Sequence, residues 1–406
     1  MEFIVIFGGE SWEHEISIVS AITLKKELKN IAHFVFIDAE NEAYLVPHDM
    51  MKSTHFSTLA YKKDAKLTFT KGGFLQSGLL KKQILRGVAI NLIHGKSGED
   101  GQLAGILDFY EIPFIGPRIE GSVVSFNKEM TKIYAKSIGV RVLEYLTLGA
   151  NAKLANAESS AKISLDASAE SKSAESSAES KSAKSSAESA NAESSAPTLS
   201  FGANTESKSA ESSAESAHTL TFPCIVKPLH LGSSIGIAVA KSRDDLTYAL
   251  DCAFEFDNRV IIEPFIPHIR EFNLAGCKIN GEFVFSMIEE VKKDEFLDFK
   301  DKYLDFQSGQ KKQGADLDED LQNKIKADFA KIYNDCFEGA LIRCDFFLLN
   351  DEIYLNEINP IPGSLAHYLF DDLNAILQNL SQNLPKTRKI PLKYQYISKI
   401  QAQKGK

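Results

Sequence analysis

The sequence lacks the features that mark secreted and membrane proteins. Its five cysteines are scattered, odd in number and without a C-x-x-C pair. That pattern is typical of reduced thiols rather than of a disulfide framework. The first residues have no basic stretch, and their apolar run is too short for a signal peptide or a membrane span. We therefore expect a soluble, cytoplasmic protein with no membrane partner.

Several common chemical signatures are also missing. The chain contains no G-x-G-x-x-G, no G-x-x-x-x-G-K-[ST] and no G-x-S-x-G. The sequence also offers no convincing Cys/His pair. A formal net charge of −9 argues against general nucleic-acid binding. Any phosphate site must then be a local basic pocket.

The length and composition predict several folded domains and one interruption. With 406 residues, the chain is too long for a single core. From about 150 to 218 it consists almost entirely of Ala, Ser, Glu and Lys, which cannot bury enough apolar surface to order a segment. We expect that stretch to be a disordered insertion. The division that we expect is 1–121, then 122–271 containing the insertion, then 272–385, and a basic tail at 386–406.

The first domain opens as an α/β unit. A buried-type strand at 3–7 is followed by Gly8-Gly9 and by a helical apolar pattern, which predicts a doubly wound parallel sheet. Glu13 and Glu15 favour the positive end of that helix. A second strand, at 88–93, runs into the loop HGKSGEDGQLAG, whose first residue is His94. A histidine enclosed by such a glycine-rich loop is a candidate site residue.

The middle of the chain offers a phosphate cradle. A strand at 222–228 ends near Lys227 and is followed by the small-residue loop 229–237, which offers several N–H groups and hydroxyls. A helix that opens near Asn127 carries Lys132 and Lys136, which we expect to be solvated. The strand at 260–266 ends in proline, and the free backbone groups beyond it suit an adenine edge.

Two β-runs near the C-terminus place acidic side chains together. They run from Leu341 to Asn359 and are joined by a polar turn at 350–352. If the pair closes as a hairpin, Asp345 lies opposite Glu357, and Glu357 and Asn359 share a face. Two carboxylates and an amide oxygen suit Mg²⁺. The alternative is an edge strand with solvated acids. Along the same face we expect apolar neighbours: Phe347, Leu349, Ile353 and Leu355.

Together these motifs resemble the ATP-grasp superfamily, and more closely the D-alanine–D-alanine ligase family. The resemblance rests on GGESWEHEIS, HGKSGEDGQLAG, FPCIVKP with GSSIG, and IRCDFFLLNDEIYLNEINPIPG, in that order along the chain. It implies an α/β (α+β ATP-grasp) fold, with an N-terminal doubly wound parallel-sheet domain followed by two ATP-grasp domains. It also implies an enzyme that joins two D-alanines through an acyl phosphate, for peptidoglycan precursor synthesis.

The resemblance also implies roles for individual residues. The metal ligands would be Asp345, Glu357 and Asn359, holding two Mg²⁺ or Mn²⁺ ions against the phosphates of ATP. The ATP-binding set would be Lys128, Lys227, Ser233, Ser234, Glu263, Pro264, Phe265, Ile266 and Glu271. The catalytic set would be Glu15, Ser233, Tyr303, Arg343 and Gly363. In that set, Glu15 holds the first substrate's ammonium and is linked through Ser233 to Tyr303, while Arg343 and the Gly363 N–H stabilise the oxyanion. The other substrate contacts would be His94, Lys302 and Tyr368.

Two departures and two alternatives remain. Gly314-Ala315 stands where the family usually has Pro-Ala, and the loop 364–369 differs from the commoner version at the second substrate's carboxylate. One alternative is another ATP-grasp carboxylate–amine ligase with different substrates. The second is a nucleotide-binding protein without catalysis. The resemblance further implies a homodimer through the first domain, and Tyr303 would sit on a lid around 296–311.

Overall fold

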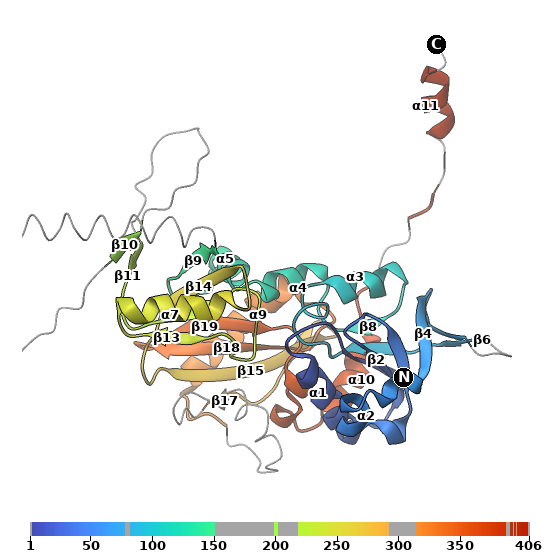
Figure 1. Ribbon diagram of the computed structural model, residues 1–406, viewed down its shortest axis with the longest axis horizontal. Coiled ribbons are helices and arrows are strands. Elements are labelled where there is room, and N and C mark those ends of the chain that lie inside the picture. The colour runs from blue at the N-terminus through green and yellow to red at the C-terminus, as the bar shows by residue number, and fades with distance from the viewer. Residues whose placement is uncertain are drawn as a thin grey trace, which may run out of the picture.

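The chain folds around three large β-sheets (Figure 1). The structure is a computed structural model, and it describes residues 2–77, 82–150, 199–201, 218–291, 314–386, 390–392, 394 and 396–404. The three sheets use strands from 3–115, 146–264 and 270–359 respectively. The domain boundaries expected from the sequence stay a prediction; we call the parts of the chain that carry the first, second and third sheets the first, central (second) and third domains.

The first sheet has eight strands in the order β6-β5-β4-β3-β2-β1-β7-β8. β1 pairs in parallel with β2 and β7, and β7 with β8, which is the α/β unit that the sequence predicts. β1 is buried along its whole length, as expected for a parallel strand covered on both faces. From β2 to β6 the sheet continues as an antiparallel meander, which the sequence analysis did not identify. The strands are β1 (Phe3–Gly8), β2 (Ile31–Ile37), β3 (Ala43–Val46), β4 (Ala65–Thr70), β5 (Gly73–Ser77), β6 (Lys82–Leu85), β7 (Val88–Asn91) and β8 (Phe114–Ile115).

Short helices accompany this sheet, and one of them is fixed by serine hydroxyls. Ser17 of α1 accepts from the Gly8 N–H at 2.8 Å and donates to the Leu92 carbonyl at 2.6 Å. These bonds hold the start of α1 over the ends of β1 and β7. The helical segments are α1 (His14–Glu27), η1 (His48–Met50), α2 (Ser53–Ser57), η2 (Ala60–Lys63) and α3 (Gln102–Phe109).

The second sheet is antiparallel, with the order β13-β12-β14-β9. Asn127 caps α5 by accepting from the Met130 N–H, and Ser242 caps α7 in the same way from Asp245. The elements are α4 (Ile119–Phe126), α5 (Lys128–Ser137), β9 (Leu146–Gly149), β12 (Cys224–Pro228), β13 (Ala238–Ala240), α7 (Arg243–Phe254) and β14 (Arg259–Pro264). Most of the expected insertion lies outside the described residues. Within it, β10 (Leu199–Phe201) pairs with β11 (His218–Leu220).

The third sheet carries the predicted hairpin. Its order is β16-β15-β18-β19, with β17 paired to β15. The elements are β15 (Arg270–Ile279), β16 (Glu282–Phe285), β17 (Glu289–Glu290), α9 (Glu319–Cys336), β18 (Ile342–Leu349), β19 (Glu352–Asn359), η4 (Gly363–Leu369), α10 (Leu373–Gln382) and α11 (Ile397–Lys404). The lid expected at 296–311 lies outside the described residues. In the basic tail, α11 stands apart from the three sheets (Figure 1).

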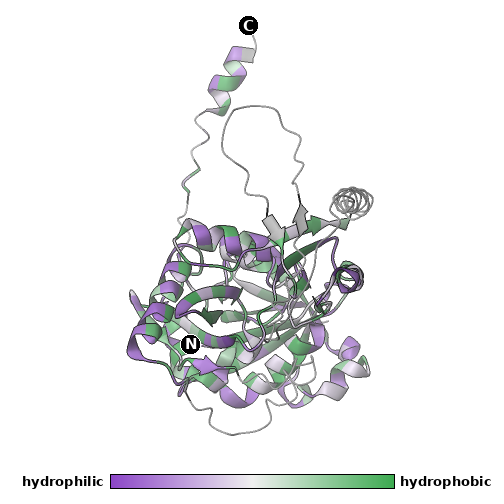
Figure 2. Cartoon of the chain, turned by 90° about the vertical axis from the view of Figure 1, so that its left-hand side faces the viewer, coloured by the Kyte–Doolittle hydropathy of each residue, from purple (hydrophilic) through white to green (hydrophobic). Residues whose placement is uncertain are grey.

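Apolar side chains form three buried clusters. One joins a face of the first sheet to the helices and strands of the third domain, a second fills the other face of the first sheet, and a third fills the central domain. Figure 2 shows the same pattern, with apolar strands inside and polar helix faces outside. In the described part of the chain, no helix has both the length and the apolarity to cross a membrane.

Two helical glycines offer a matched test of packing. A Cβ at Gly121 in α4 would lie 2.5 Å from the Cys336 carbonyl oxygen, whereas at Gly105 in α3 its nearest contact is Ile119 Cδ1 at 3.7 Å. Gly121→Ala should lower the melting temperature, because overpacking costs about 1–3 kcal/mol. Gly105→Ala should leave it unchanged or raise it, since alanine favours helix. Calorimetry compares the two variants, and equal melting temperatures would contradict this packing.

Candidate active site

The hairpin β18–β19 brings the predicted metal ligands together. Asp345 pairs with Glu357, and Arg343 pairs with Asn359. The turn consists of Asn350 and Asp351, both with positive φ (51° and 59°), which is typical of a tight hairpin turn. Asn359 Nδ2 also donates to Asp345 Oδ2 at 3.0 Å. The register expected from the sequence is therefore confirmed at this end of the hairpin.

Beyond the acidic pair, the predicted apolar face is wrong. The register shifts between Asp345 and Phe346, so that Phe346 opposes Leu355 and Asn356 is the extra residue of a bulge. Phe347 consequently opposes Tyr354, while Ile353 opposes Leu348 on the other face. Strict alternation could not anticipate the bulge.

Arg343 is held by Asp345. Its Nε donates to Oδ1 at 2.7 Å and its Nη2 to Oδ2 at 2.8 Å, and the aspartate is almost fully buried. This two-pronged geometry fixes the orientation of the guanidinium. Arg343 therefore lies beside the expected metal ligands and is bound to one of them, Asp345.

The electrostatics of the hairpin fit a cation. Burial raises the pKa of Asp345 to about 7. The nearby charges of Glu357 and Glu271 also raise this pKa, whereas Arg343 lowers it. Carboxylates that repel one another in a buried site are stabilised by a divalent ion. Among the described residues, no three His, Cys, Asp or Glu side chains are grouped so that they could hold a metal ion together. The donor set is thus two carboxylates and an amide, which leaves positions for phosphate and water.

One pocket is lined by residues of all three domains. It is bordered by Glu99 of the first domain, by Lys128 and Gly232 of the second, and by Glu357 and Asn359 of the third. Lys128 is the first residue of α5, and its ammonium donates to the Leu231 carbonyl of the glycine loop. Burial lowers the pKa of Lys128, and Glu357 acts in the opposite direction.

A second pocket contains the predicted adenine contacts. It is lined by Leu143, Ile225, Lys227, Glu263, Pro264, Phe265, Ile266, Ile269 and Phe347. The aliphatic and aromatic side chains suit a flat base. Glu271 lies on β15 opposite Phe347 of β18. The structure thus brings this predicted set to one place.

The carboxylate of Glu263 is held by two lysines. Its Oε2 lies 2.8 Å from Lys227 Nζ and its Oε1 lies 2.6 Å from Lys132 Nζ. Burial alone would raise the pKa of Glu263, but the two ammonium groups lower it to about 2. Lys132 is only 2% exposed, so the expectation that it is solvated is wrong. Lys136, with half of its side chain exposed, is solvated as expected.

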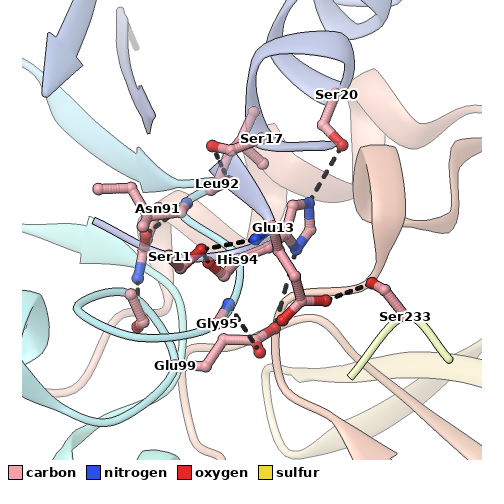
Figure 3. Close-up of polar contacts among 12 residues, drawn as sticks. Ser11, Glu13, Ser17, Ser20, Asn91, Leu92, His94, Gly95, Glu99 and Ser233 are labelled. Carbon is pink, nitrogen blue, oxygen red and sulfur yellow. Dashed lines mark hydrogen bonds and ion pairs between the residues drawn. The ribbon is translucent and has the colours of Figure 1, made fainter. Parts of the chain in front are cut away.

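The glycine loop reaches the first domain through Ser233. Its hydroxyl donates to the carboxylate of Glu13, as Figure 3 shows. Ser233 and Ser234 both have positive φ (55° and 58°). Glu15 is exposed on the first turn of α1. The expected link from Glu15 to Ser233 is therefore wrong, and Glu13, two residues earlier, occupies that position.

Glu13 lies in a cradle built from backbone. A Cβ at Gly95 would lie 2.7 Å from its Oε2, and one at Gly232 would lie 3.0 Å from its Oε1. Gly95 also has φ of +72°, so both position and conformation require glycine. Burial raises the pKa of Glu13, and the charge of Glu99 raises it further. Glu13 and Glu99 are thus two acids at one place, where the ammonium group of a ligand would favour their ionised form.

His94 is fixed beside this acidic pair. Ser20 Oγ lies 3.1 Å from His94 Nε2, and Glu99 Oε1 lies 3.8 Å from its Nδ1. Ser11 donates to the His94 carbonyl at 2.7 Å and accepts from the Glu13 N–H at 3.0 Å (Figure 3). The loop of the histidine and the turn before α1 therefore hold each other in place.

Ser20 also connects the site to the loop after the hairpin. It accepts from the Ser364 N–H at 3.0 Å, next to Gly363 at the start of η4. Residues 364–366 all have positive φ, which gives this loop an unusual tight turn. Burial raises the pKa of Tyr368, and nearby Arg343 acts in the opposite direction. Tyr368 thus lies beside the arginine, whereas Lys302 and Tyr303 lie outside the described residues.

Sequence reasoning missed several residues of this site. Glu99 lies in the HGKSGEDG loop, where an acidic residue near His94 could have indicated a site residue. Lys132 had only its spacing of four from Lys128. Ser11 and Ser20 had no recognisable signal, because each acts through bonds to distant backbone or side chains.

Comparisons with known proteins agree with this geometry. Residues 2–117 match the model of the D-ala D-ala ligase N-terminus, and residues 196–375 match that of the D-ala D-ala ligase C-terminus. The chain is 49% identical over 407 residues to a D-alanine–D-alanine ligase of Wolinella succinogenes, with 100% of each chain covered. It is 46% identical over 406 residues to the one of Helicobacter pylori strain P12, again with 100% of each covered.

A solved structure gives the same result. The crystal structure of D-alanine–D-alanine ligase from Helicobacter pylori matches with a TM-score of 0.73 and 42% sequence identity. The match covers 96% of this chain and 100% of that one. The chain belongs to the D-alanine–D-alanine ligase family.

Proposed function

We propose that the protein is an ATP-dependent ligase that joins two D-alanines into D-alanyl-D-alanine for peptidoglycan precursor synthesis. The observation that carries this proposal is the pocket shared by all three domains, in which Lys128 lies with Glu357 and Asn359. A cationic side chain and metal-type ligands around one space suit a triphosphate. The family membership supports the same reaction.

We place the nucleotide across the two pockets. The base would lie between Phe265, Ile266 and Phe347, and the phosphates would extend past Lys227 toward Lys128. Glu263 would contact the base through its backbone, since its carboxylate is bound to two lysines. Glu271 would hold the ribose, and Ser233 and Ser234 would close over the terminal phosphate.

The hairpin would hold two Mg²⁺ or Mn²⁺ ions through Asp345, Glu357 and Asn359. When bound, these ions would offset the phosphate charge. Asp345 is shared with Arg343, so the same carboxylate would orient both the metal end and the guanidinium.

The first D-alanine would bind by its ammonium to Glu13, beside Glu99 and His94. Its carboxylate would then attack the γ-phosphate and form an acyl phosphate with release of ADP. The amine of a second D-alanine would displace the phosphate, with Arg343 and the Gly363 N–H facing the oxyanion. Tyr368, Lys302 and Tyr303 belong to the proposed second-substrate side. Positioning and charge supply this catalysis, without a protein nucleophile.

We also propose a homodimer in the cytoplasm. All five cysteines are free thiols, which fits a reducing compartment. α3 and α4 follow one another along one side of the molecule (Figure 1) and expose Ile106, Phe109, Ile119 and Val123. Apolar side chains gathered on neighbouring helices are typical of an interface, and a second copy of the chain would cover them.

Phosphate release tests the reaction itself. With ATP, Mg²⁺ and D-alanine, we expect rapid release of phosphate and formation of the dipeptide, measured by a coupled assay and by mass spectrometry. Release only with other amino acids would favour a ligase of different specificity. No release with any amino acid, despite ATP binding, would favour a binding protein without catalysis.

Glu13 and Glu15 form a matched pair. Glu13→Gln should raise the KM for the first D-alanine by about tenfold or more, because a charge-assisted bond to the ammonium is lost. Glu15→Gln should leave the KM values for the first and the second D-alanine unchanged, since this side chain is exposed. Steady-state kinetics at saturating ATP separate the two. A larger effect at Glu15 would return the role to the residue first expected.

Arg343→Met should reduce turnover by about a hundredfold or more, because one oxyanion donor is lost. ATP binding, measured by calorimetry, should change little. Arg141→Met is the control, because Arg141 pairs with Glu352 on the surface. Turnover that stays near normal in Arg343→Met would remove this residue from the mechanism.

Phe109→Glu should convert the dimer to a monomer, measured by light scattering after gel filtration. Phe109 is 83% exposed, so the substitution should leave the fold intact. Tyr248→Glu on α7 is the control, since Tyr248 is an exposed aromatic of another domain. A wild-type chain that is monomeric at all concentrations would contradict the dimer.

A further inference from the structure

Three lysines of α5 lie four residues apart, yet their surroundings differ. Lys128 lines the pocket shared by the three domains. Lys136 is half exposed and lies 3.5 Å from Glu144. Lys132 is buried, and its ammonium lies 2.6 Å from Glu263. A lysine is almost never fully buried unless it has a specific partner, so Lys132 requires an explanation beyond helix solubility.

Glu263 is shared between two ammonium groups. Lys132 approaches Oε1 and Lys227 approaches Oε2, at 2.6 and 2.8 Å. The side chain of Glu263 is only 4% exposed, and that of Lys227 only 12%. Burial alone would lower the pKa of Lys227, but Glu263 raises it, so this lysine stays charged. The three groups together carry one net positive charge.

Of Lys132, Lys227 and Glu263, only two line the second pocket. Lys227 and Glu263 line the second pocket, whereas Lys132 does not. Lys132 lies behind them, with its ammonium 5.8 Å from the centroid of the Tyr145 ring. Because Lys132 is only 2% exposed and its ammonium is paired with Glu263, we expect its effect on a nucleotide in that pocket to act through Glu263.

We propose that Lys132 is a positioning residue for nucleotide binding, which neutralises Glu263 so that the charge of Lys227 is available to the triphosphate. A lone Glu263–Lys227 pair would be neutral and would keep the ammonium bound to the carboxylate. With Lys132 present, Glu263 retains a partner when Lys227 turns toward a phosphate, so no carboxylate is buried alone. This inference rests on the proposed role of Lys227 in ATP binding.

The test is a charge cycle on the full-length chain. Lys132→Met should weaken ATP binding, measured by calorimetry with Mg²⁺, by about tenfold or more, because Lys227 is then retained by an unbalanced carboxylate. The KM for ATP should rise in parallel while kcat at saturating ATP changes by less than about threefold. Lys132→Arg should retain affinity, since it keeps the charge. Lys136→Met, the matched control on the same helix, should behave as wild type.

The double variant Lys132→Met/Glu263→Gln distinguishes this role from simple packing. It removes the carboxylate together with its extra lysine, so ATP affinity should return to within about threefold of wild type. It also carries the test if Lys132→Met alone does not fold. The inference is overturned if Lys132→Met lowers the melting temperature without changing ATP affinity, or if the double variant remains weak. Lys227→Met separates the two ideas, because unchanged ATP binding in that variant would instead refute the proposed nucleotide site.

Discussion

The structure depends on how buried carboxylates are balanced. Glu13, Glu263 and Asp345 are all nearly inaccessible to water, where an unpaired negative charge is strongly destabilised. Each is treated differently. Glu263 is neutralised by two lysines and Asp345 by one arginine. Glu13 accepts from the Ser233 hydroxyl; the charge of Glu99 raises its pKa, whereas His94 and Lys128 lower it. Two neighbouring acids therefore lie where a substrate ammonium is proposed to bind.

The same balance connects the domains. Glu13 belongs to the first domain and Ser233 to the second, and Ser20 of α1 reaches the Ser364 N–H beyond the hairpin of the third. Both contacts are polar; Ser233 lies on the glycine loop, whereas Ser20 is a buried residue of α1. The site is consequently assembled from segments that are far apart in the chain and that bind one another through a few directed bonds.

Much of this could be predicted from the sequence, wherever the signal is local. The alternation around Asp345 and Glu357 fixed their pairing, and the glycine-rich loops marked the ends of strands beside the pockets. Local sequence does not indicate which of Glu13 and Glu15 binds Ser233. Both acids lie at the start of α1, and only the position where the helix begins, at His14, decides which one turns inward. The burial of Lys132 was also hidden, because its partner Glu263 is distant in sequence and a helical lysine is normally exposed.

The hairpin and the Ala/Ser/Glu/Lys stretch differ in how they tolerate insertions and deletions. Between β9 and β12 the chain has accepted a long, compositionally simple extension while the four-stranded sheet that they share is retained. Between β18 and β19, by contrast, a two-residue turn and one bulged residue, Asn356, set the register that holds Asp345 opposite Glu357. Natural variation in length should therefore concentrate at the first junction and be absent from the second.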